Sequence, residues 1–453
     1  MGKSQGYDKY KDSGVEWLGA IPEHWEVIPI KFSLSMPITD GPHETPDLLD
    51  DGIPFISAEA IKNDQINFDK KRGYISLEEH KRFSKKYKPK YGDVYMVKSG
   101  ATTGNVARVQ THEEFNIWSP LAALRPNQEK TTTDFLFYVI KSKPFFYSVE
   151  QSWSFGTQQN IGMGIIANIR ITFPPLEEQE KIARFLDYKT KQIDDLIAKK
   201  ETLIEKLDEK RTALISHAVT KGLDVNVPMK DSGIEWLGAI PNHWEVKRLK
   251  QVTKLIDGDI VKNYPNENDL QDEGIPFLST ENIKFNTFDF SQRTKFITLE
   301  KFESLSRGKL IQNDLVVTMR GTIGQTALFH KVPYETAFIN AQMIIVRPTN
   351  IFAEFLKYIS MSVLWAKQLD FYSYGTAQQQ LSGAILGILR LGFPPLDEQE
   401  KIARFLDQKT AQIDEQKTKI QQAIDLLKEY RTALITNAVT GKIDVRKITI
   451  PKI

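Results

Sequence analysis

The chain has no cysteine and no long run of apolar residues. Without cysteine it can form no disulfide, no thiolate metal site and no cysteine nucleophile, which is compatible with a reducing compartment. A membrane-spanning helix needs about eighteen or more consecutive apolar residues, and a secretory signal needs an apolar stretch near the N-terminus. The sequence contains neither pattern, so we predict a cytoplasmic protein.

The chain also lacks an excess of charge of either sign. Its 60 Lys and Arg residues and 58 Asp and Glu residues give a net charge of +2. Such a balance does not by itself indicate nucleic-acid binding, so any DNA contact must come from local basic patches or from partner proteins. The length of 453 residues and the hydrophobic content of 41% predict roughly two to four domains with cores of their own.

Enzyme motifs are missing as well. The two Pro-Pro pairs, at 174–175 and 394–395, lack the neighbours with which an amino-methyltransferase holds its target base. The seven histidines have no metal-ligand spacing, and we expect His24 and His243 to pack or to cap. Nuclease-like Asp-x-Lys pairs fall inside predicted helices, where a solvated face is the better interpretation: Asp187/Lys189 and Asp407/Lys409. We therefore predict a non-catalytic chain that binds no metal and no cofactor.

What the sequence does have is one unit written twice. Residues 11–27 return as residues 230–246 with only two of seventeen positions changed. Residues 173–187 return in the same way as residues 393–407. Between these matched segments the two copies diverge, and each reads as short strands with a few helices. The repeated unit is thus a globular segment followed by a second, nearly invariant segment.

The second matched segment predicts a long helix in each copy. Pro-Pro stops the preceding strand, and the acids that follow suit a helix N-terminus. Apolar residues then recur in alternating steps of four and three, the seam of a coiled coil, so we expect the two helices to pair. About forty residues span roughly 60 Å, a rod rather than a core element. The predicted seam comprises Ile182, Leu186, Ile193, Leu196, Leu203, Leu207 and Leu214 in the first helix, and Ile402, Leu406, Ile413, Ile420, Leu427 and Leu434 in the second.

An antiparallel pair about a pseudo-two-fold axis would return the C-terminus to the first globule. The predicted fold class is therefore α+β, with two mixed α/β domains joined by an antiparallel coiled coil in a circular arrangement. The predicted boundaries are 1–175 for the first domain, 176–218 for the first helix, 219–229 for a linker, 230–395 for the second domain, 396–438 for the second helix, and 439–453 for a tail beside the first domain.

A basic cluster in the first globule is a candidate for contact with DNA phosphates. Six basic residues lie within ten positions that contain no acid, interleaved with Phe83, Tyr87 and Tyr91. A solvated helix face and loop is the alternative interpretation. The second globule carries only Lys301, Arg307 and Lys309 in the matching region, so the halves would bind DNA unequally. The cluster comprises Lys81, Arg82, Lys85, Lys86, Lys88 and Lys90.

Two further sets of polar residues could reach base edges. Glycine turns place polar side chains at hairpin tips, although turn chemistry alone would also explain the glycines. Two Gln-rich segments could pair with adenine or could cap a helix. The turn candidates are Lys98, Ser99, Thr102 and Thr103 in the first globule and Arg320, Thr322 and Gln325 in the second; the others are Gln158, Asn160, Gln378 and Gln380.

These features together resemble the specificity subunit of type I restriction-modification systems. The resemblance rests on two variable globules alternating with two near-identical helices, on the Asp-Gly, Gly-Ile-Pro-Phe and Gly-Thr-Ile-Gly segments, and on the Pro-Pro-Leu-x-Glu-Gln helix start. It implies that each globule is a target recognition domain, similar to the DNA-reading domain of TaqI-type adenine methyltransferases. It also implies that the coiled coil sets the spacing between the domains.

The same resemblance implies the partners. Double-stranded DNA would be the target, and two modification subunits would bring S-adenosylmethionine and adenine-N6 methyl transfer. Two restriction subunits, which are motor-nucleases, would add ATP, Mg²⁺ and cleavage. Two other readings of the same layout stay open: a stand-alone DNA-binding regulator, and a coiled-coil interaction scaffold with no role in DNA binding.

Overall fold

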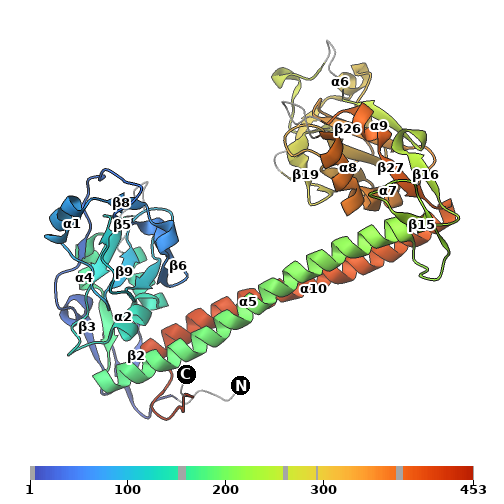
Figure 1. Cartoon of the computed structure of the whole chain (residues 1–453). Helices are drawn as coiled ribbons and strands as arrows, with labels where there is room; N and C mark the ends of the chain where they lie inside the picture. Colours follow the sequence, from blue (N-terminus) through green and yellow to red (C-terminus); the bar gives the residue numbers. More distant parts are fainter. Residues whose placement is uncertain (1–5, 152–159, 259–263, 292–293, 374–380, 452–453) are drawn as a thin grey trace. The chain divides into compact units, whose positions relative to one another are not determined.

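The computed structural model describes residues 6–151, 160–258, 264–291, 294–373 and 381–451. The candidates Gln158, Gln378 and Gln380 lie outside the described residues. The chain divides into two compact units, one of residues 1–200 and 421–453 and the other of residues 201–420. Each unit contains one globule and the adjoining parts of two long helices, α5 (Leu176–Lys221) and α10 (Leu396–Val439) (Figure 1).

The first globule is built on two sheets. The larger is antiparallel, with the order β10 (Val106–Arg108), β9 (Val94–Val97), β12 (Leu121–Leu124) and β4 (Thr39–Asp40). The smaller has the order β11 (Asn116–Ile117), β5 (Ile53–Ile56) and β8 (Gly73–Ile75), with β5 parallel to β11. Three two-stranded ribbons and four short helices complete it: β1 (Tyr10–Asp12) with β2 (Ala20–Pro22), β3 (Glu26–Pro29) with β13 (Arg170–Phe173), β6 (Ile61–Lys62) with β7 (Gln65–Ile66), α1 (Leu77–Ser84), α2 (Thr133–Ile140), α3 (Lys143–Gln151) and α4 (Met163–Asn168).

The second globule repeats this plan. Its larger sheet has the order β17 (Thr253–Asp257), β26 (Met343–Pro348), β23 (Asp314–Thr318) and β24 (Thr326–Phe329). Its smaller sheet has the order β21 (Lys295–Ile297), β18 (Ile275–Leu278), β25 (Ala337–Ile339) and β22 (Lys309–Leu310). The ribbons and helices are β14 (Met229–Asp231) with β15 (Ala239–Pro241), β16 (Glu245–Arg248) with β27 (Arg390–Phe393), β19 (Ile283–Lys284) with β20 (Thr287–Phe288), α6 (Leu299–Ser304), α7 (Ala353–Ser360), α8 (Val363–Ser373) and α9 (Gly383–Ile388).

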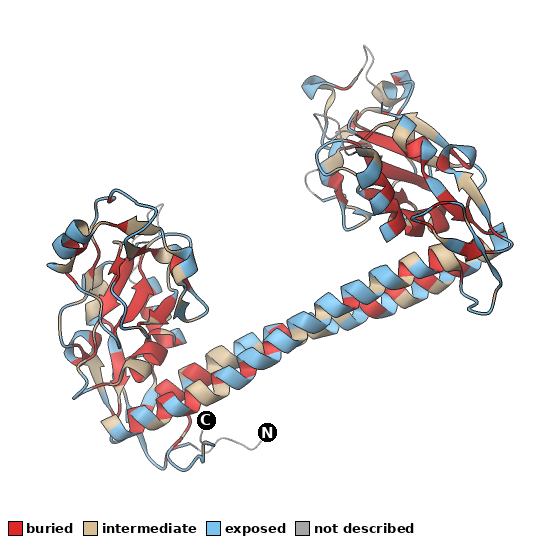
Figure 2. Ribbon diagram, in the orientation of Figure 1, coloured by how far each residue is buried: buried red, intermediate tan, exposed pale blue. Residues whose placement is uncertain are grey.

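The central strand of each larger sheet is buried along its whole length. Every residue of β9 and of β23 is buried, which explains their continuous apolar sequence (Figure 2). A buried carboxylate stands at the start of each strand and takes two bonds from an arginine on the neighbouring strand or just after it. Arg125 Nε lies 2.7 Å from Asp93 Oδ1, and Arg347 Nε lies 2.8 Å from Asp314 Oδ1. This ion pair, present in both globules, belongs to the shared scaffold.

Ion pairs between α5 and α10 fix their antiparallel register within each unit. As the position in α5 rises from 194 to 208 and 211, its partner in α10 falls from 431 to 417 and 414. Exchanging the two repeats converts the first of these pairs into the last, because both of its residues shift by the repeat length. The predicted antiparallel coiled coil with pseudo-two-fold symmetry is therefore confirmed. The pairs are Asp194–Arg431 in the first unit, and Asp208–Lys417 and Arg211–Asp414 in the second.

The buried seam differs from the predicted one at alternate positions. Leu196 and Leu203 are exposed, whereas Ile197 is buried and Ile204 is half-buried. The steps of three and four occur in the opposite order because Thr190 is buried. Its hydroxyl donates a hydrogen bond to the carbonyl of Leu186 at 2.7 Å. Thr410 does the same in α10. The remaining predicted positions are buried, namely Ile182, Leu186, Ile193, Leu207, Ile402, Leu406, Ile413 and Leu434, or half-buried, namely Leu214, Ile420 and Leu427.

A glutamate, buried in the first unit and half-buried in the second, ties the start of each long helix to its globule. Glu178 accepts hydrogen bonds from the Trp25 indole at 3.2 Å and from the Tyr7 hydroxyl, and lies 2.8 Å from His24 Nε2. Burial, with Glu178 as the next cause, raises the pKa of Tyr7 well above its usual range, so this hydroxyl stays protonated and donates. His24, which we expected to pack or to cap, thus contacts Glu178. The second unit repeats the contact with Glu398, Trp244 and His243.

The next residue of the motif performs a similar task. Gln179 is fully buried; its carbonyl accepts from the Thr131 hydroxyl at 2.7 Å, and its amide donates to the carbonyl of Lys130 at 3.0 Å. In the second unit the Gln399 carbonyl accepts from the backbone N–H of Phe352 at 2.9 Å. The near-identity of the two helix starts therefore has a structural cause, because each residue satisfies buried polar groups of the globule.

The ends of the helices are core elements as well as parts of a rod. In the second unit one continuous hydrophobic core contains residues from the end of α5, from the start of α10, and Trp244. Asp407 is exposed, as expected, and Asp187 is half-buried; both also accept from tyrosine hydroxyls, of α7 and α2, at 2.6 and 2.7 Å. The helix residues of this core are Ile215, Ala218 and Val219 from α5 and Ile402, Ala403 and Leu406 from α10.

The tail after α10 lies against the first globule, which confirms the circular arrangement. The Tyr10 hydroxyl donates to the carbonyl of Gly441 at 3.0 Å, and the Lys442 ammonium donates to the carbonyl of Ala20. Gly441 has a φ of +73°, and a Cβ there would lie 2.3 Å from Pro22, so only glycine fits. In the second unit, Lys221 of α5 donates to the carbonyl of Ala239, the counterpart of Ala20.

A four-residue ion network attaches the first globule to α10. Asp64, at the tip of the β6–β7 hairpin, pairs with Lys141 and with Arg431 at 2.8 Å, and Arg431 also binds Asp194. Burial acts to raise the pKa of Asp64, but the charges of Lys141 and Arg431 outweigh it and hold the pKa below its usual value. The second globule differs here, because the positions that match Asp64 and Lys141 in the repeat alignment are Asn286 and Met361, which carry no charge.

We predict that Asp64→Asn destabilises the first unit by roughly 1–3 kcal/mol, because it leaves the largely buried Lys141 without a carboxylate partner and Arg431 with Asp194 alone. The folded pKa of Asp64 is depressed, so its contribution is complete above the unfolded pKa of about 3.9 and disappears as the pH falls through the folded value. Thermal denaturation between pH 3 and 8 should show a deficit at neutral pH that shrinks in acid. Asp47→Asn, at an exposed position, is the control, and a deficit independent of pH would contradict the assignment.

Candidate nucleic-acid interface

The buried Asp40 connects the basic cluster to the first glycine turn. Its carboxylate accepts a hydrogen bond from the Lys86 ammonium at 2.5 Å and lies 3.4 Å from the Lys98 ammonium. Lys86 follows α1, and Lys98 precedes the turn, so two candidate groups that are separate in sequence converge on one side chain. The adjacent Gly41 is required because a Cβ would lie 1.8 Å from the carbonyl oxygen of Ile117. Asp257, at the matching position of the second globule, is exposed.

The six basic residues of the cluster do not all present free charge. Lys86 binds Asp40, Arg82 pairs with Glu44 at 2.5 Å, and Lys88 pairs with Glu114 at 2.5 Å. Lys98, predicted at the turn, is buried on Asp40, which places it inside the globule rather than on a DNA-facing surface. The side chains that are exposed and form no ion pair with another described residue are Lys81, Lys85 and Lys90.

Most of the aromatic residues within the cluster belong to the core. Phe83 and Tyr87 are buried, and the Tyr87 hydroxyl bonds to Asp93 and Tyr95. Burial raises the pKa of Tyr87 well above its usual range. Tyr91 is exposed and stacks on His112 with a ring separation of 4.7 Å. Of the three interleaved aromatics, Tyr91 alone is in a position to contact a ligand.

The first glycine turn lies beside Asn160, the residue of the first Gln-rich segment that the structure describes. Ser99 and Asn160 form an antiparallel bridge, and the backbone N–H of Ile161 donates to the carbonyl of Lys98 at 2.8 Å. Thr102 is exposed, whereas the Thr103 hydroxyl closes the turn on the carbonyl of Gly100 at 2.6 Å. The structure thus brings Ser99, Thr102 and Asn160 to one hairpin tip.

The second glycine turn carries Arg320, Thr322 and Gln325, and all three are exposed. Thr318, at the base of the turn, accepts from the backbone N–H of Gln325 at 3.0 Å and donates to the carbonyl of Thr322. The Thr318 hydroxyl therefore bonds backbone groups of the turn, and the three predicted side chains lie at its exposed surface. Their chemistry differs from that of the first turn, which has Ser99 where this turn has Arg320.

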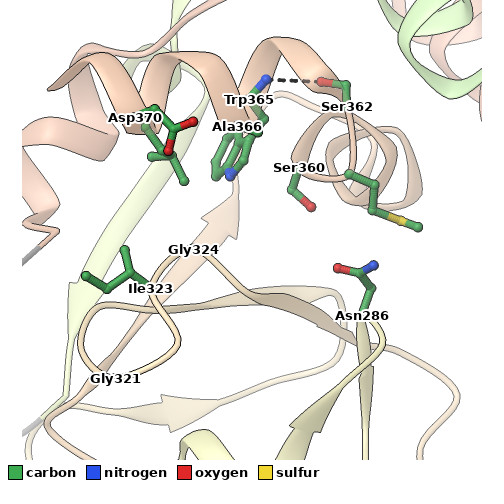
Figure 3. A pocket seen from close by; sticks show the side chains of 11 residues that line it. Asn286, Gly321, Ile323, Gly324, Ser360, Ser362, Trp365, Ala366 and Asp370 are labelled. Carbon is green, nitrogen blue, oxygen red and sulfur yellow. Dashed lines mark hydrogen bonds between the residues drawn. The ribbon is translucent and has the colours of Figure 1, made fainter. Parts of the chain in front are cut away.

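A cavity of about 730 Å³ opens beside the second turn, between Gly324, Asn286 of the β19–β20 hairpin, and α7–α8. Figure 3 shows that the Trp365 indole extends from α8 toward the turn. The Trp365 side-chain N–H is buried and has no hydrogen-bond partner among the described residues. The first globule has a cavity of about 220 Å³ at the matching place, because the Phe146 ring replaces Ala366 and Lys141 pairs with Asp64. The two globules thus differ beside both turns.

Sequence reasoning missed the tip of the β19–β20 hairpin. Phe285 and Asn286 have φ values of +50° and +61°, as in the tight turns that suit this connection. The Phe285 side chain is 95% exposed, and its counterpart in the first globule is Asn63. A fully exposed phenylalanine in a left-handed conformation is costly, which makes it a candidate for stacking on a base. The only signal in the sequence is Phe-Asn between two short strands.

Neither a metal centre nor a membrane span is present in the part of the chain that the structure describes. There, no three His, Asp or Glu residues are placed to hold a metal ion. No helix within the described ranges is long and apolar enough to cross a bilayer.

Two segments, residues 41–206 and 241–425, match the family described as Type I restriction modification DNA specificity domain. The chain belongs to this family. Each match covers most of one globule and a large part of the long helix that follows it, so the repeat found in the sequence is a repeat of the specificity domain.

Curated relatives include two specificity subunits. The putative type I restriction enzyme MjaX specificity subunit of Methanocaldococcus jannaschii is 26% identical over 443 residues, which is 95% of this chain and 96% of that relative. The type I restriction enzyme EcoKI specificity subunit of Escherichia coli is 29% identical over 211 residues, or 46% of this chain and 44% of that relative. The second alignment therefore spans less than half of either protein.

Two solved structures share the fold of this specificity chain. One comes from work on complex assembly and conformational transition of the type I R-M system; it has a TM-score of 0.70 at 16% identity, covering 92% of this chain and 98% of that one. The other is the HsdS subunit from Thermoanaerobacter tengcongensis, with a TM-score of 0.53 at 17% identity, covering 93% and 98%. The predicted arrangement of two recognition domains and two long helices is that of these structures.

We predict that combining Lys81→Ala, Lys85→Ala and Lys90→Ala lowers the affinity for DNA of any sequence. Removing one phosphate contact should make the slope of log Kobs against log salt concentration less negative by about 0.9, so the triple variant should change it by roughly 2–3. Fluorescence anisotropy of the specificity chain with its partner subunits, at several salt concentrations, measures this slope. Lys88→Ala, which removes a charge already paired with Glu114, is the control; an unchanged slope in the triple variant would place the DNA elsewhere.

Proposed function

We propose that this chain reads DNA for a type I restriction-modification complex, with each domain recognising one half of a split, asymmetric target. The observation that carries the proposal is the contrast between repeated anchors and divergent surfaces. The anchors recur in both halves as Glu178 and Glu398, Gln179 and Gln399, and Asp187 and Asp407. The turn residues, the adjoining cavities and the free lysines differ between the halves.

The long helices would set the spacing between the two half-sites. Their ends are anchored in the globules by hydrogen bonds of buried side chains, and their register is held by ion pairs. Neither helix can therefore slide along the other without breaking these hydrogen bonds and these ion pairs. Two unlike reading domains on a fixed spacer predict two short recognised sequences separated by bases that are not read.

The reaction would belong to the partners. Two modification subunits would bind S-adenosylmethionine and transfer its methyl group to the N6 atom of adenine. Two restriction subunits would use ATP and Mg²⁺ to translocate and cut unmodified DNA. This chain would supply binding and orientation: the exposed lysines meet phosphates, and the turn residues, Phe285 and the cavity beside Trp365 meet bases. Its near-neutral charge is tolerable if the modification subunits contribute phosphate contacts.

Mapping adenine methylation across a genome tests the proposal directly. Cells that express the modification subunit with this chain should methylate one split, asymmetric motif, and cells without the chain should not. A deletion of the chain that leaves the methylation pattern unchanged would sink the proposal. Expression of the modification subunit alone, verified by immunoblot, controls for its abundance.

A further inference from the structure

Each unit exposes a pair of aromatic residues whose rings are in contact at a tilted angle, and one member of each pair is a tryptophan of the repeated segment 11–27 or 230–246. Trp17 is 40% exposed and lies 5.7 Å, ring to ring, from Tyr147, which is 45% exposed. Trp236 is 37% exposed and lies 5.5 Å from Phe371, which is 63% exposed. Large aromatic side chains left at a surface in this way are typical of the centre of a protein interface.

The two pairs are built from different positions of the repeat. Tyr147 lies in α3 and Phe371 in α8, and in the alignment of the two copies Phe371 corresponds to Gln151, one helical turn further on than Tyr147. The second copy has Lys367 where the first has Tyr147. The aromatic partner has therefore changed its position in the sequence while remaining beside the tryptophan.

In each unit a lysine ammonium also holds the segment around the tryptophan, and this lysine too comes from different positions of the repeat. Lys442 donates to the carbonyl of Ala20 in the first unit, and Lys221 donates to the carbonyl of Ala239 in the second. These lysines are one position apart in the repeat alignment, because the sequence is Thr-Gly-Lys in one copy and Thr-Lys-Gly in the other. The same placement of the tryptophan segment is thus reached by two different sequences.

Local structure explains only part of the identity of this segment. Asp12 and Asp231 accept from the N–H groups of Gly14 and Gly233 at 3.0 Å. Glu16 and Glu235 are exposed and form no ion pair with another described residue, and Trp17 and Trp236 remain exposed beside them. A tryptophan that stays exposed beside a glutamate with no ion pair among the described residues, in both copies, indicates a partner outside the chain.

The partner is a protein rather than DNA. A surface that reads sequence has to differ between two unlike half-sites, whereas the exposed Glu-Trp pair and an aromatic partner for the tryptophan recur in both halves. Glu16 and Glu235 would also repel phosphates. In the first unit a cavity of about 490 Å³, lined by Trp17, Gly164, Ile165 and Arg170, offers a depression for a partner side chain.

We propose that the Trp17–Tyr147 and Trp236–Phe371 surfaces are the two docking sites for the modification subunit, one copy on each. This rests on the proposed function, and it assigns residues to the docking that the function requires. The modification subunit would present an apolar side chain to the aromatic pair and a basic side chain to Glu16 or Glu235. Two equal surfaces account for two equal copies of one partner.

Native mass spectrometry of the full-length chain mixed with the modification subunit of its own system tests the assignment. The wild-type chain should bind two copies, Trp17→Ala and Trp236→Ala should each bind one, and the double variant should bind at least tenfold more weakly at both sites. Glu16→Arg combined with Glu235→Arg should weaken docking in the same sense without removing an aromatic ring. Trp17→Phe should retain two copies.

Phe32→Ala is the matched control, since Phe32 is exposed and corresponds to Gln251 in the second copy. It should bind two copies. Double tryptophan and double glutamate variants that still bind two copies with wild-type affinity would overturn the docking assignment and leave the proposed function standing. A wild-type chain that binds no modification subunit would instead refute the proposed function itself. Variants that lose DNA affinity while keeping both subunits would also overturn the assignment.

Discussion

A glutamate carboxylate at the start of each long helix, buried in the first unit and half-buried in the second, forms the contact on which the rest of the structure depends. Glu178 meets Trp25, His24 and Tyr7, and Glu398 meets Trp244 and His243. A buried carboxylate is stable only when its oxygens are satisfied, so its presence fixes both the helix start and the segment that carries the tryptophan. That segment also bears the exposed Trp17 or Trp236, so the same anchor orients the helix, the globule and the surface that we assign to a partner.

The two units share this anchor but differ in the charged residues and in the cavity beside the glycine turn. The first globule is linked to α10 through Asp64, Lys141 and Arg431, and it carries lysines that are free to meet phosphates. The second globule has neutral residues in place of Asp64 and Lys141, and a larger cavity beside its glycine turn, where an indole N–H has no partner among the described residues. The divergence is concentrated where a ligand would be read, and the repetition where the chain holds itself together. A DNA-reading subunit that must recognise two unlike sequences while binding the same partner twice needs this division.

The repeat, the antiparallel helix pair and the circular return of the tail could be predicted, because each follows from residues that match between the copies. The phase of the seam could not. Thr190 and Lys189 are neighbours, and the structure places Thr190 inward, where its hydroxyl meets the carbonyl of Leu186 and the Tyr138 hydroxyl of α2, a residue distant in sequence. The basic cluster was predicted as a set, but its free members depended on Asp40, Glu44 and Glu114, which are distant in sequence. The Phe285 tip could not be predicted because short strands flanking two residues leave almost no pattern.

The central claim is that each globule reads its own half of one DNA target while the repeated frame stays constant. Exchanging residues 28–172 for the matching region of another member of the family, and then sequencing the methylated sites, measures this most directly. The account predicts that one half of the methylated motif changes while the other half and the spacer length stay the same. A change in both halves, or in neither, would contradict it.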